Sequence, residues 1–357
     1  MKNQNLTKHF SIHGLINLEI NNEKGTLFGA TSLNNPLSYF EVDHIGKDVD
    51  ICMNIGDFKP KFKENYLVDH KYHINENYLY VEDYGNSANW KLEIEGLEEP
   101  PVTINFNGNI KGIYKYIFAD ALAFEVVLKP VIELLLGFKG YFLAHAGSIS
   151  MNNNSELFFG TEGSLKTTII LEGLKRGYRI LGDDKVILDL DRKKAFSFPV
   201  YPQLFEYTVG VGREELSFTD KFKFLYQSFK YKKSAEFWEN QSFIFNKGFL
   251  LKRFKNKAEP TIKQDENHQI LTSIINNNKG EMYNSSLSSI VGKNNFPNYL
   301  LAYSYIFNSG NIAEYWVNLE NNLYESFKNI TLYEINIPEK YNETTLKKIF
   351  TMIEDFQ

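Results

Sequence analysis

Cysteine is the scarcest residue of this 357-residue sequence, in which Cys52 stands alone. One cysteine excludes an internal disulfide and a zinc site built from several cysteines of the same chain. Such a composition is typical of the reducing cytoplasm, and Cys52 itself is expected to be a small buried apolar residue. We therefore expect a cytoplasmic protein whose fold does not depend on disulfide bonds.

The sequence also lacks the signals of a secreted, membrane or nucleic-acid-binding protein. Residues 1–14 have no apolar core of the kind found in signal peptides. The most apolar run, 117–138, carries charged residues that are costly at the centre of a bilayer, namely Asp120, Glu125, Lys129 and Glu133. The net charge of −5 lacks the basic excess of a nucleic-acid binder. We expect neither a membrane nor a nucleic acid as partner.

Hydrophobic residues form 43% and charged residues 23% of the chain, which are the proportions of a globular protein. The length allows one large domain or two of ordinary size. Residues 1–112 consist of short alternating runs separated by Gly, Asn and Asp, a pattern typical of strands joined by turns. We predict a β-rich N-terminal lobe over residues 1–112 and a second domain over residues 113–357.

The second domain begins with a different pattern. Apolar residues follow a helical period over 115–138, and Gly137 and Gly140 are expected to end this helix. The elements expected after it are a strand, an Asn-rich turn, a second strand, a glycine-bearing loop with its helix, and two further strands. Their ranges are 141–151, 152–154, 156–159, 160–177, 178–181 and 186–190.

The loop after the second of these strands has the spacing of a phosphate-binding loop, or P-loop. In such loops glycines let successive backbone N–H groups curl around phosphate oxygens. A lysine reaches the terminal phosphates, a Ser or Thr holds magnesium, and the following helix directs its positive end at the anion. The residues expected to contact a nucleotide are Gly160, Thr161, Glu162, Gly163, Ser164, Leu165, Lys166, Thr167 and Thr168.

Leu165 occupies the position at which the P-loop pattern requires glycine. A side chain there clashes with phosphate or strains the backbone, at a cost of about 1–3 kcal/mol where a positive φ is needed. Two alternatives stay open. The loop binds nucleotide despite Leu165, or the chain has kept the fold of an enzyme and lost its turnover.

Two adjacent carboxylates, Asp183 and Asp184, follow Gly182 at the end of a predicted strand. One helix after a P-loop, such a pair suits two tasks. One carboxylate can orient or deprotonate an attacking hydroxyl, and the other can complete the coordination of magnesium. A polar turn at the end of a strand is the structural alternative.

The segment from His145 to Asp184 resembles the catalytic core of the HPr kinase/phosphorylase family, which is similar to the nucleotide-binding core of phosphoenolpyruvate carboxykinases. The family pattern is a strand bearing His, a second strand, a glycine-rich loop with Lys-Ser/Thr, a helix ending in Arg-Gly, and two aspartates. The matching segments are LAHAGSIS, ELFFGTEGSLKTT and LKRGYRILGDDKVIL. The resemblance implies an α/β (α+β) fold, in which the β-rich lobe is followed by an HPr kinase-like P-loop core.

The resemblance also implies a role for each residue of the site. Lys166 would bind the β- and γ-phosphates of ATP, and Thr167 and Asp184 would hold Mg²⁺. Asp183 would act as general base toward a serine hydroxyl, and His145 would lie beside the phosphates. Further candidates for stabilising the transferred charge are Arg179 and Arg253.

These roles imply an ATP- and Mg²⁺-dependent kinase that phosphorylates a Ser or Thr hydroxyl of a peptide or small protein, such as a precursor in the biosynthesis of modified peptides. Thr168 replaces the acidic residue common in HPr kinases, and no Gly-Arg-Asn segment follows, so HPr itself is not the expected substrate. HPr kinases form hexamers, which makes a homo-oligomer an expectation here. The alternative is a scaffold or nucleotide-binding protein whose P-loop is degenerate at Leu165.

The C-terminal part of the sequence shows no catalytic signature of its own. Residues 213–257 combine Lys with aromatic residues, which suits either a surface that receives an acidic peptide or a solvated helical face. The Asn-rich segment 276–278 predicts a polar loop. Mixed helical segments over 295–327, a strand over 332–338 and an amphipathic helix over 344–356 complete the expected elements.

Overall fold

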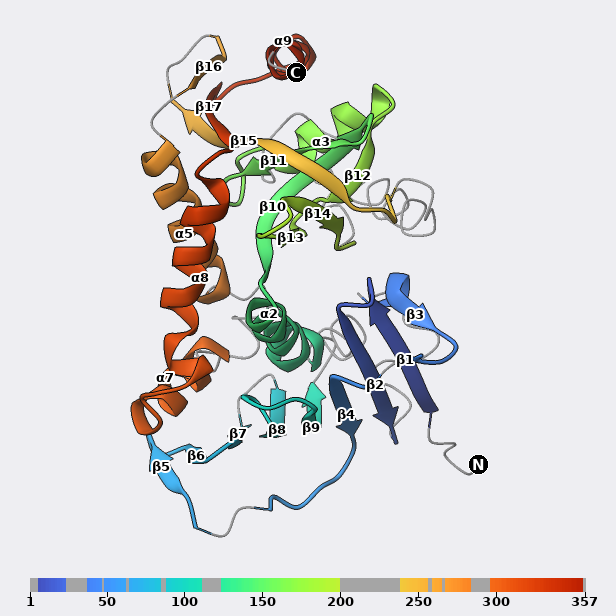
Figure 1. Cartoon of the computed structure of the whole chain (residues 1–357), viewed down its shortest axis with the longest axis vertical. Helices are drawn as coiled ribbons and strands as arrows, with labels where there is room; N and C mark the ends of the chain where they lie inside the picture. The colour runs from blue at the N-terminus through green and yellow to red at the C-terminus, as the bar shows by residue number, and fades with distance from the viewer. Residues whose placement is uncertain are drawn as a thin grey trace. The chain divides into compact units, whose positions relative to one another are not determined.

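The computed structural model of the chain describes residues 6–23, 37–46, 48–61, 64–84, 88–110, 123–199, 238–255, 259–264, 267–283 and 296–355. These residues form a mixed α and β structure with two large sheets (Figure 1). The chain divides into two compact units. The first comprises Met1–Lys139 and Met282–Asn318, and the second comprises Gly140–Glu281 and Leu319–Gln357.

The described part of the first unit forms a nine-stranded sheet in the order β3-β1-β2-β4-β9-β8-β7-β6-β5. Its pairs are antiparallel except β2 with β4 and β4 with β9, which are parallel. The strands are β1 (Leu6–Ile12), β2 (Ile16–Asn22), β3 (Glu41–Val42), β4 (Ile51–Ile55), β5 (Tyr66–Val68), β6 (Tyr72–Asn75), β7 (Tyr78–Tyr84), β8 (Ala88–Glu95) and β9 (Val102–Ile110). The β-rich character predicted for the N-terminal region is confirmed.

Alternation of apolar residues explains why these segments form strands with one buried face. In β4, Ile51, Met53 and Ile55 are completely buried, while the residues between them are partly exposed. Successive side chains of a strand point to opposite faces of the sheet, so one face collects the apolar residues of each strand. This face is the core of the first unit.

The helix predicted over 115–138 follows β9, and the structure describes part of it. Residues 111–122 lie outside the described residues, and the described part consists of the π-helical turn Phe124–Leu128 (η3) and α2 (Lys129–Phe138). Gly137 lies inside α2, so the expectation that it ends the helix is wrong. A Cβ at Gly137 would lie 2.5 Å from Cε2 of Tyr315, and the glycine therefore allows a close helix contact. The chain turns at Gly140, where φ is +79°.

A C-terminal segment also belongs to the first unit, through α7 (Phe296–Ile306) and the beginning of α8 (Asn311–Phe327). Tyr299 of α7 is completely buried, and its ring lies 5.5 Å from the ring of Tyr72 and 6.3 Å from that of Trp90. The hydroxyl of Tyr303 accepts a hydrogen bond from the backbone N–H of Asn77 at 3.0 Å. The first compact unit thus extends beyond the predicted boundary at residue 112 and includes a C-terminal segment.

The described part of the second unit is built on an eight-stranded sheet in the order β11-β10-β13-β14-β15-β17-β16, with β12 paired to β10. Because β15 also pairs with β11, the pairings around β11, β10, β13, β14 and β15 form a closed ring. The strands are β10 (Tyr141–Met151), β11 (Asn154–Phe159), β12 (Arg179–Gly182), β13 (Lys185–Asp189), β14 (Lys194–Ser197), β15 (Phe243–Phe254), β16 (Thr261–Gln264) and β17 (Thr331–Pro338).

Helices cover both faces of this sheet (Figure 1). They include α3 (Lys166–Lys175), α5 (Asn267–Tyr283), the end of α8 and α9 (Glu343–Glu354). On one face, the backbone of Gly147 in β10 faces Ile170 of α3, because a Cβ there would lie 2.4 Å from Cδ1 of Ile170. On the other face, the ring of Phe327 packs against Phe159 and Phe245, with ring centroids 6.1 and 5.7 Å apart. The sheet is therefore buried on both sides.

The elements predicted around the loop are confirmed. The segment 141–151 is β10, the segment 156–159 lies in β11, and the strands expected over 178–181 and 186–190 correspond to β12 and β13 within one residue at each end. Asn152 and Asn153 form the predicted turn with φ values of 51° and 68°, which asparagine tolerates better than most residues. The helix predicted at the C-terminus is α9, which begins with a capping box between Asn342 and Thr345.

The prediction of a polar loop over 276–278 is wrong, because these residues lie inside α5. The side chains of Ile270, Leu271, Ile274 and Ile275 are buried at helical spacing, and their packing outweighs the low helix propensity of asparagine. Of the segment 213–257, residues 213–237 lie outside the described residues, so the proposed basic aromatic surface stays a prediction.

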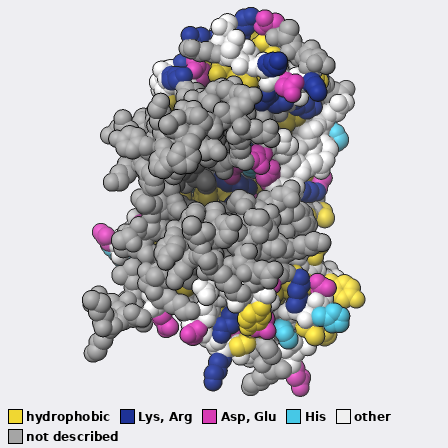
Figure 2. All heavy atoms as spheres, turned by 180° about the vertical axis from the view of Figure 1, so that it is seen from behind, with side chains coloured by type: hydrophobic (Ala, Val, Ile, Leu, Met, Phe, Trp, Pro, Cys, Tyr) yellow, Lys and Arg dark blue, Asp and Glu magenta, His cyan; other side chains and the backbone are white. Residues whose placement is uncertain are grey.

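The described surface carries charges of both signs. On the face shown in Figure 2, Lys and Arg side chains are interspersed with Asp and Glu side chains. Among the residues that the structure describes, no helix is both long and apolar enough to cross a membrane.

Candidate phosphate-binding site

The glycine-bearing loop connects the end of β11 at Phe159 to Lys166, the first residue of α3. Gly160 and Gly163 have φ values of +155° and +78°, which side-chain-bearing residues rarely adopt. A Cβ on Gly160 would lie 2.6 Å from Oγ of Ser164 and 3.0 Å from the carbonyl oxygen of Leu251. Glycine at this position therefore allows the loop to fold tightly against the end of β15.

Leu165 adopts a left-handed conformation, with φ 76° and ψ 21°. For a bulky residue this conformation is an outlier and costs about 1–3 kcal/mol. The side chain is only 2% exposed, and the carbonyl of Leu165 accepts the hydrogen bond of Ile169 at 3.0 Å, which begins α3. The backbone thus has the conformation that glycine would supply, and the buried leucine side chain offsets the strain by its packing.

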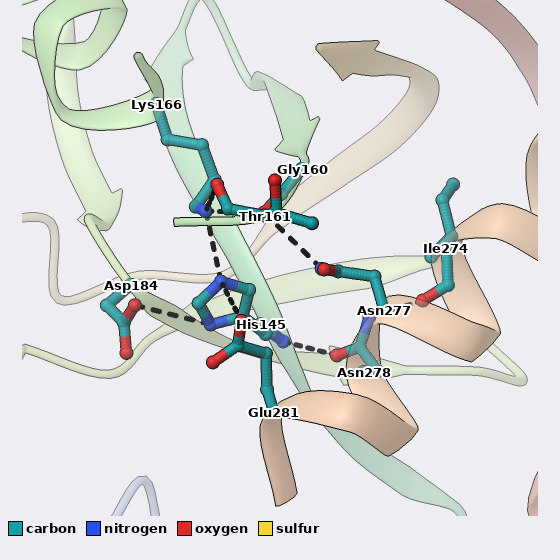
Figure 3. A network of polar contacts seen from close by, with 9 residues as sticks. All are labelled: His145, Gly160, Thr161, Lys166, Asp184, Ile274, Asn277, Asn278 and Glu281. Atoms are coloured by element: carbon teal, nitrogen blue, oxygen red, sulfur yellow. Dashed lines mark hydrogen bonds and ion pairs between the residues drawn. The ribbon is translucent and has the colours of Figure 1, made fainter. Parts of the chain in front are cut away.

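Lys166 is buried, and its ammonium group lies against the loop and His145 (Figure 3). Nζ donates to the carbonyl oxygens of Gly160 at 2.5 Å and Thr161 at 3.2 Å, and it lies 3.0 Å from Nε2 of His145. Burial lowers the pKa of Lys166, and the nearby carboxylates of Asp184, Glu281 and Asp183 oppose this change. The loop carbonyls and His145 therefore hold the ammonium group of Lys166 inside the fold.

His145 comes from β10 and is 4% exposed. Its Nδ1 lies 3.2 Å from Oδ1 of Asp184, and its Nε2 lies 3.8 Å from Oε1 of Glu281. Because the charged ammonium group of Lys166 can only donate, Nε2 is the acceptor of that contact. With Lys166 charged, the ring proton is assigned to Nδ1, which then donates to Oδ1 of Asp184. His145 therefore links the lysine of the loop to the carboxylate of the next turn.

Asp183 and Asp184 form the turn between β12 and β13. The backbone N–H of Ala146 in β10 donates to the carbonyl of Asp184 at 3.1 Å, which fixes the turn beside the strand that carries His145. Asp183 is 2% exposed, whereas the side chain of Asp184 is 38% exposed. The two carboxylates thus differ in environment, because Asp183 is buried and Asp184 is open to solvent.

Helix α5 contributes polar side chains that the sequence reading did not assign to the site (Figure 3). The Nδ2 of Asn277 donates to the carbonyl of Gly160 at 3.3 Å, and the Oδ1 of Asn278 accepts from the backbone N–H of His145 at 2.5 Å. Burial and the charge of Asp184 raise the pKa of Glu281. The sequence feature that could have placed these residues together is the i, i+4 spacing of Asn277 and Glu281 within a helical apolar pattern.

A cavity of about 630 Å³ adjoins the loop, a size within the range of small-molecule sites. It is lined by residues 160–164, by the end of β15, and by Ser273 and Asn277 of α5. Arg253 of β15 is one of the lining residues, and its Nη1 donates to the carbonyl of Gly163 at 3.2 Å. Its guanidinium group lies 5.2 Å from the ring of Tyr341.

The structure separates the two arginines suggested from the sequence. Arg253 contacts the loop, whereas Arg179 donates to the carbonyl of Trp238 at 3.0 Å and lies 3.4 Å from the carboxylate of Glu239. Arg179 is thus engaged by Trp238 and Glu239, in the segment that follows residue 237.

The oxygen donors suggested for Mg²⁺ have suitable chemistry. Mg²⁺ prefers carboxylate, hydroxyl and phosphate oxygens and keeps several waters, and Thr167 is partly exposed at the start of α3. Within the described ranges, no group of three or more His, Cys, Asp or Glu side chains could hold a metal ion. A magnesium ion held by Thr167 and Asp184 would therefore need further ligands from phosphate and water. Thr168, by contrast, is 1% exposed and points away from solvent.

Fold and site together define a mixed α and β protein in which a tight glycine-bearing loop brings a buried lysine to a histidine and a carboxylate pair. Comparison with protein-family models and with curated proteins finds no match to the chain. The function of the chain is therefore inferred from the geometry of the site and from the resemblance of its motifs.

Proposed function

We propose that the chain is an ATP- and Mg²⁺-dependent kinase, related to the HPr kinase-like enzymes, that phosphorylates a Ser or Thr hydroxyl of a peptide or small protein. The observation that carries the proposal is the position of Lys166. It follows a left-handed residue, begins α3, and places Nζ 3.0 Å from His145, whose other ring nitrogen lies 3.2 Å from Asp184. These parts correspond to the phosphate-binding, positioning and acidic elements of a phosphoryl-transfer site.

Phosphate binding is assigned to the loop, to Lys166 and to the first turn of α3. The backbone N–H groups at a helix N-terminus and the helix dipole favour an anion. On binding, Lys166 would exchange its contacts with the carbonyls of Gly160 and Thr161 for phosphate oxygens. A lysine already stripped of water then gains a strong charge-assisted hydrogen bond.

Phosphoryl transfer is assigned to the carboxylate pair. Asp183 would orient the acceptor hydroxyl and take its proton, while Asp184 and Thr167 would hold Mg²⁺. When bound, Mg²⁺ supplies positive charge that offsets the charge of the phosphate oxygens. His145 would keep Asp184 in place through the hydrogen bond from Nδ1, so it acts as a positioning residue.

A second candidate function is nucleotide binding without turnover, in a protein that has kept the fold of a kinase. It is favoured by the two hydrogen bonds that Lys166 donates to carbonyls of its own loop, at 2.5 and 3.2 Å. A nucleotide must break both contacts before the lysine can reach a phosphate. The same cost would weaken binding and slow transfer.

Calorimetric titration with MgATP and transfer of labelled γ-phosphate to an array of Ser- and Thr-containing peptides test the proposal. Lys166→Met is expected to weaken MgATP binding by about 10–100-fold, since a hydrogen bond to a charged group contributes about 1.5–3 kcal/mol. Lys175→Met is the matched control, because Lys175 lies at the other end of α3 and pairs with Glu172 at 3.4 Å. It should bind MgATP as the unaltered chain does.

The carboxylate role is tested in the same assays with Asp183→Asn. We expect binding of MgATP to change little and transfer to fall by about 10²–10⁴-fold, as for loss of a general base. Binding without transfer in the unaltered chain would support the second candidate function. No heat with millimolar MgATP, or transfer that survives Asp183→Asn, would contradict the assigned roles.

A further inference from the structure

A second cavity, of about 360 Å³, lies at the opposite end of β11 from the loop. Its lining comes from the turn between β10 and β11, from the beginning of β11, from β15 and from the start of the segment leading into β12. The polar residues that line it are Asn152, Asn154, Ser155, Glu156, Tyr178, Asn246 and Lys247. This cavity shares no lining residue with the one beside the loop.

Glu156 is the buried acid of this cavity. It is 7% exposed, and its Oε2 has no hydrogen-bond partner among the described residues. Buried polar atoms in proteins are almost always hydrogen-bonded, and an unsatisfied one costs about 1–3 kcal/mol or more if it is charged. Glu156 thus brings a largely buried carboxyl group, one oxygen of which is unsatisfied, to the lining of this cavity.

A β-bulge gives the cavity its shape. In the pairing of β11 with β15, Ser155 lies opposite Phe245 but Glu156 lies opposite Lys247, so Asn246 is an extra residue in β15. Bulges redirect side chains and interrupt the hydrogen-bond ladder. Asn246 is thereby exposed at the cavity, and Lys247 is placed beside Glu156.

The charged and titratable groups around Glu156 do not fully compensate the negative charge of its carboxylate. Burial raises the pKa of Glu156 to about 7, and Lys247 offsets only part of this effect. Tyr178 lines the cavity, and the pKa of Tyr333 in β17 is raised by burial and by the charge of Glu156. Lys247 therefore lowers the pKa of Glu156 only in part, and near neutral pH both the neutral and the charged form of the carboxyl are populated.

We propose that this cavity is a second binding site, which takes a small ligand bearing a primary amine or an amidine group. The N–H groups of the ligand donate to the carboxyl group of Glu156, which lines the cavity, and its positive charge stabilises the carboxylate. The side chains of Asn152, Asn154 and Asn246 bind the polar remainder, since an amide group both donates and accepts. The cavity volume limits the ligand to a small molecule or the end of a peptide.

The inference is independent of the proposed kinase activity, because the loop and the cavity lie at opposite ends of β11. The phosphate-binding site favours anions, whereas Glu156 favours cations. A variant of Glu156 should therefore bind MgATP with the affinity of the unaltered chain. The two proposals can fail separately.

The test is a binding screen of the full chain at pH 8 by ligand-observed NMR, followed by calorimetry. The probes are butylamine, agmatine and benzamidine, each paired with a neutral analogue of the same shape, such as butanol for butylamine and benzamide for benzamidine. We expect at least one cationic probe to bind and its neutral partner to bind at least tenfold more weakly. Glu156→Gln should reduce the affinity for that probe at least tenfold.

A matched control is Glu325→Gln on α8, since the side chain of Glu325 is 77% exposed and the variant removes one negative charge elsewhere. Its affinity for the probe should equal that of the unaltered chain. Lys247→Met is a second variant, and it should bind the cationic probe more tightly because a competing cation is removed. This variant keeps the test decisive if Glu156→Gln folds poorly.

The pH dependence gives an independent readout. A carboxyl with a pKa of about 7 is roughly 90% ionised at pH 8 and roughly 10% ionised at pH 6. Affinity for a cationic probe should therefore fall about tenfold between pH 8 and pH 6, and this fall should disappear in Glu156→Gln. The proposal is overturned if no cationic probe binds, or if binding is the same with and without Glu156.

Discussion

At the scale of single residues, Leu165 combines a strained backbone with a buried side chain. Its φ of 76° costs about 1–3 kcal/mol, while its side chain, 2% exposed, resembles those whose truncation to alanine costs about 2–5 kcal/mol. Packing therefore outweighs strain. This balance explains how a leucine is accommodated where a glycine would be the simpler choice.

We predict that Leu165→Gly and Leu165→Ala both destabilise the chain, and that the glycine variant is the more stable of the two by about 1 kcal/mol. Both variants lose the buried leucine side chain, but only glycine relieves the left-handed strain. Urea unfolding of the two variants and of the unaltered chain measures the order.

The opposite order would contradict the left-handed backbone at position 165. At an ordinary helical position alanine is favoured over glycine by about 1 kcal/mol, so a more stable alanine variant would mean that residue 165 has right-handed geometry. The comparison therefore tests the conformation of the loop without requiring a ligand.

His145 and Asp184 show what sequence reasoning achieves at this scale. Their residue types and spacing suggested a common site, and the structure places Nδ1 and Oδ1 3.2 Å apart. The contribution of Glu281 was not predicted, because it comes from a helix more than a hundred residues later in the chain. Only a long-range contact brings it within 3.8 Å of His145.

At the scale of elements, the position of α3 depends on its close approach to the sheet and to α9. A Cβ at Gly173 would lie 2.9 Å from Cδ1 of Ile149 in β10 and 3.2 Å from Cζ of Phe350 in α9. Both neighbours are buried and have little room to move. Glycine at this position thus sets the distance between the helix and its neighbours, and hence the place of the loop that precedes it.

We predict that Gly173→Ala destabilises the chain by about 1–2 kcal/mol, because overpacking costs about 1–3 kcal/mol and exceeds the gain of about 1 kcal/mol in helix propensity. The matched control is Gly280→Ala in α5, where a Cβ would meet no heavy atom within 4 Å. It should stabilise the chain by about 0.5–1 kcal/mol. Thermal unfolding of both variants measures whether each substitution raises or lowers the stability of the chain.

Stabilisation by Gly173→Ala equal to that by Gly280→Ala would show that α3 does not pack as closely as the structure has it.

The element boundaries themselves were predictable, since alternation and helical periodicity are local properties of the sequence. Two predictions failed: Gly137 does not end α2, and the asparagines of α5 suggested a loop. There, burial of the isoleucines on one face decided the helix.

At the scale of the whole molecule, the stability of the chain should depend on pH through Glu156. Its pKa is raised to about 7 from a usual value of 4.5, so the folded state favours the protonated carboxyl. The stabilisation from this group is complete below pH 4.5 and is lost as the pH rises through 7. At about 1.4 kcal/mol for each unit between the two pKa values, the loss is about 3 kcal/mol.

We predict that the free energy of unfolding falls between pH 5 and pH 8, and that Glu156→Gln removes roughly 2.5 kcal/mol of this fall. Glutamine keeps the shape of the side chain and does not titrate. Urea unfolding at the two pH values, followed by hydrogen exchange of the β10 and β11 amides, measures the change in the second unit. An identical pH dependence in both proteins would mean that Glu156 does not titrate in this range.

The sequence by itself determined the order of strand, loop, helix and strand around residues 141–190, because these elements depend on the periodicity of neighbouring residues. It also indicated that Leu165 stands where a backbone of positive φ is needed. The tertiary structure alone decided which distant groups meet. Asn277, Asn278 and Glu281 reach His145 and the loop, Arg253 contacts the loop, and a bulge in β15 near Glu156 adjoins a second cavity. Such contacts follow from the packing of the whole sheet and its helices, which no local pattern encodes.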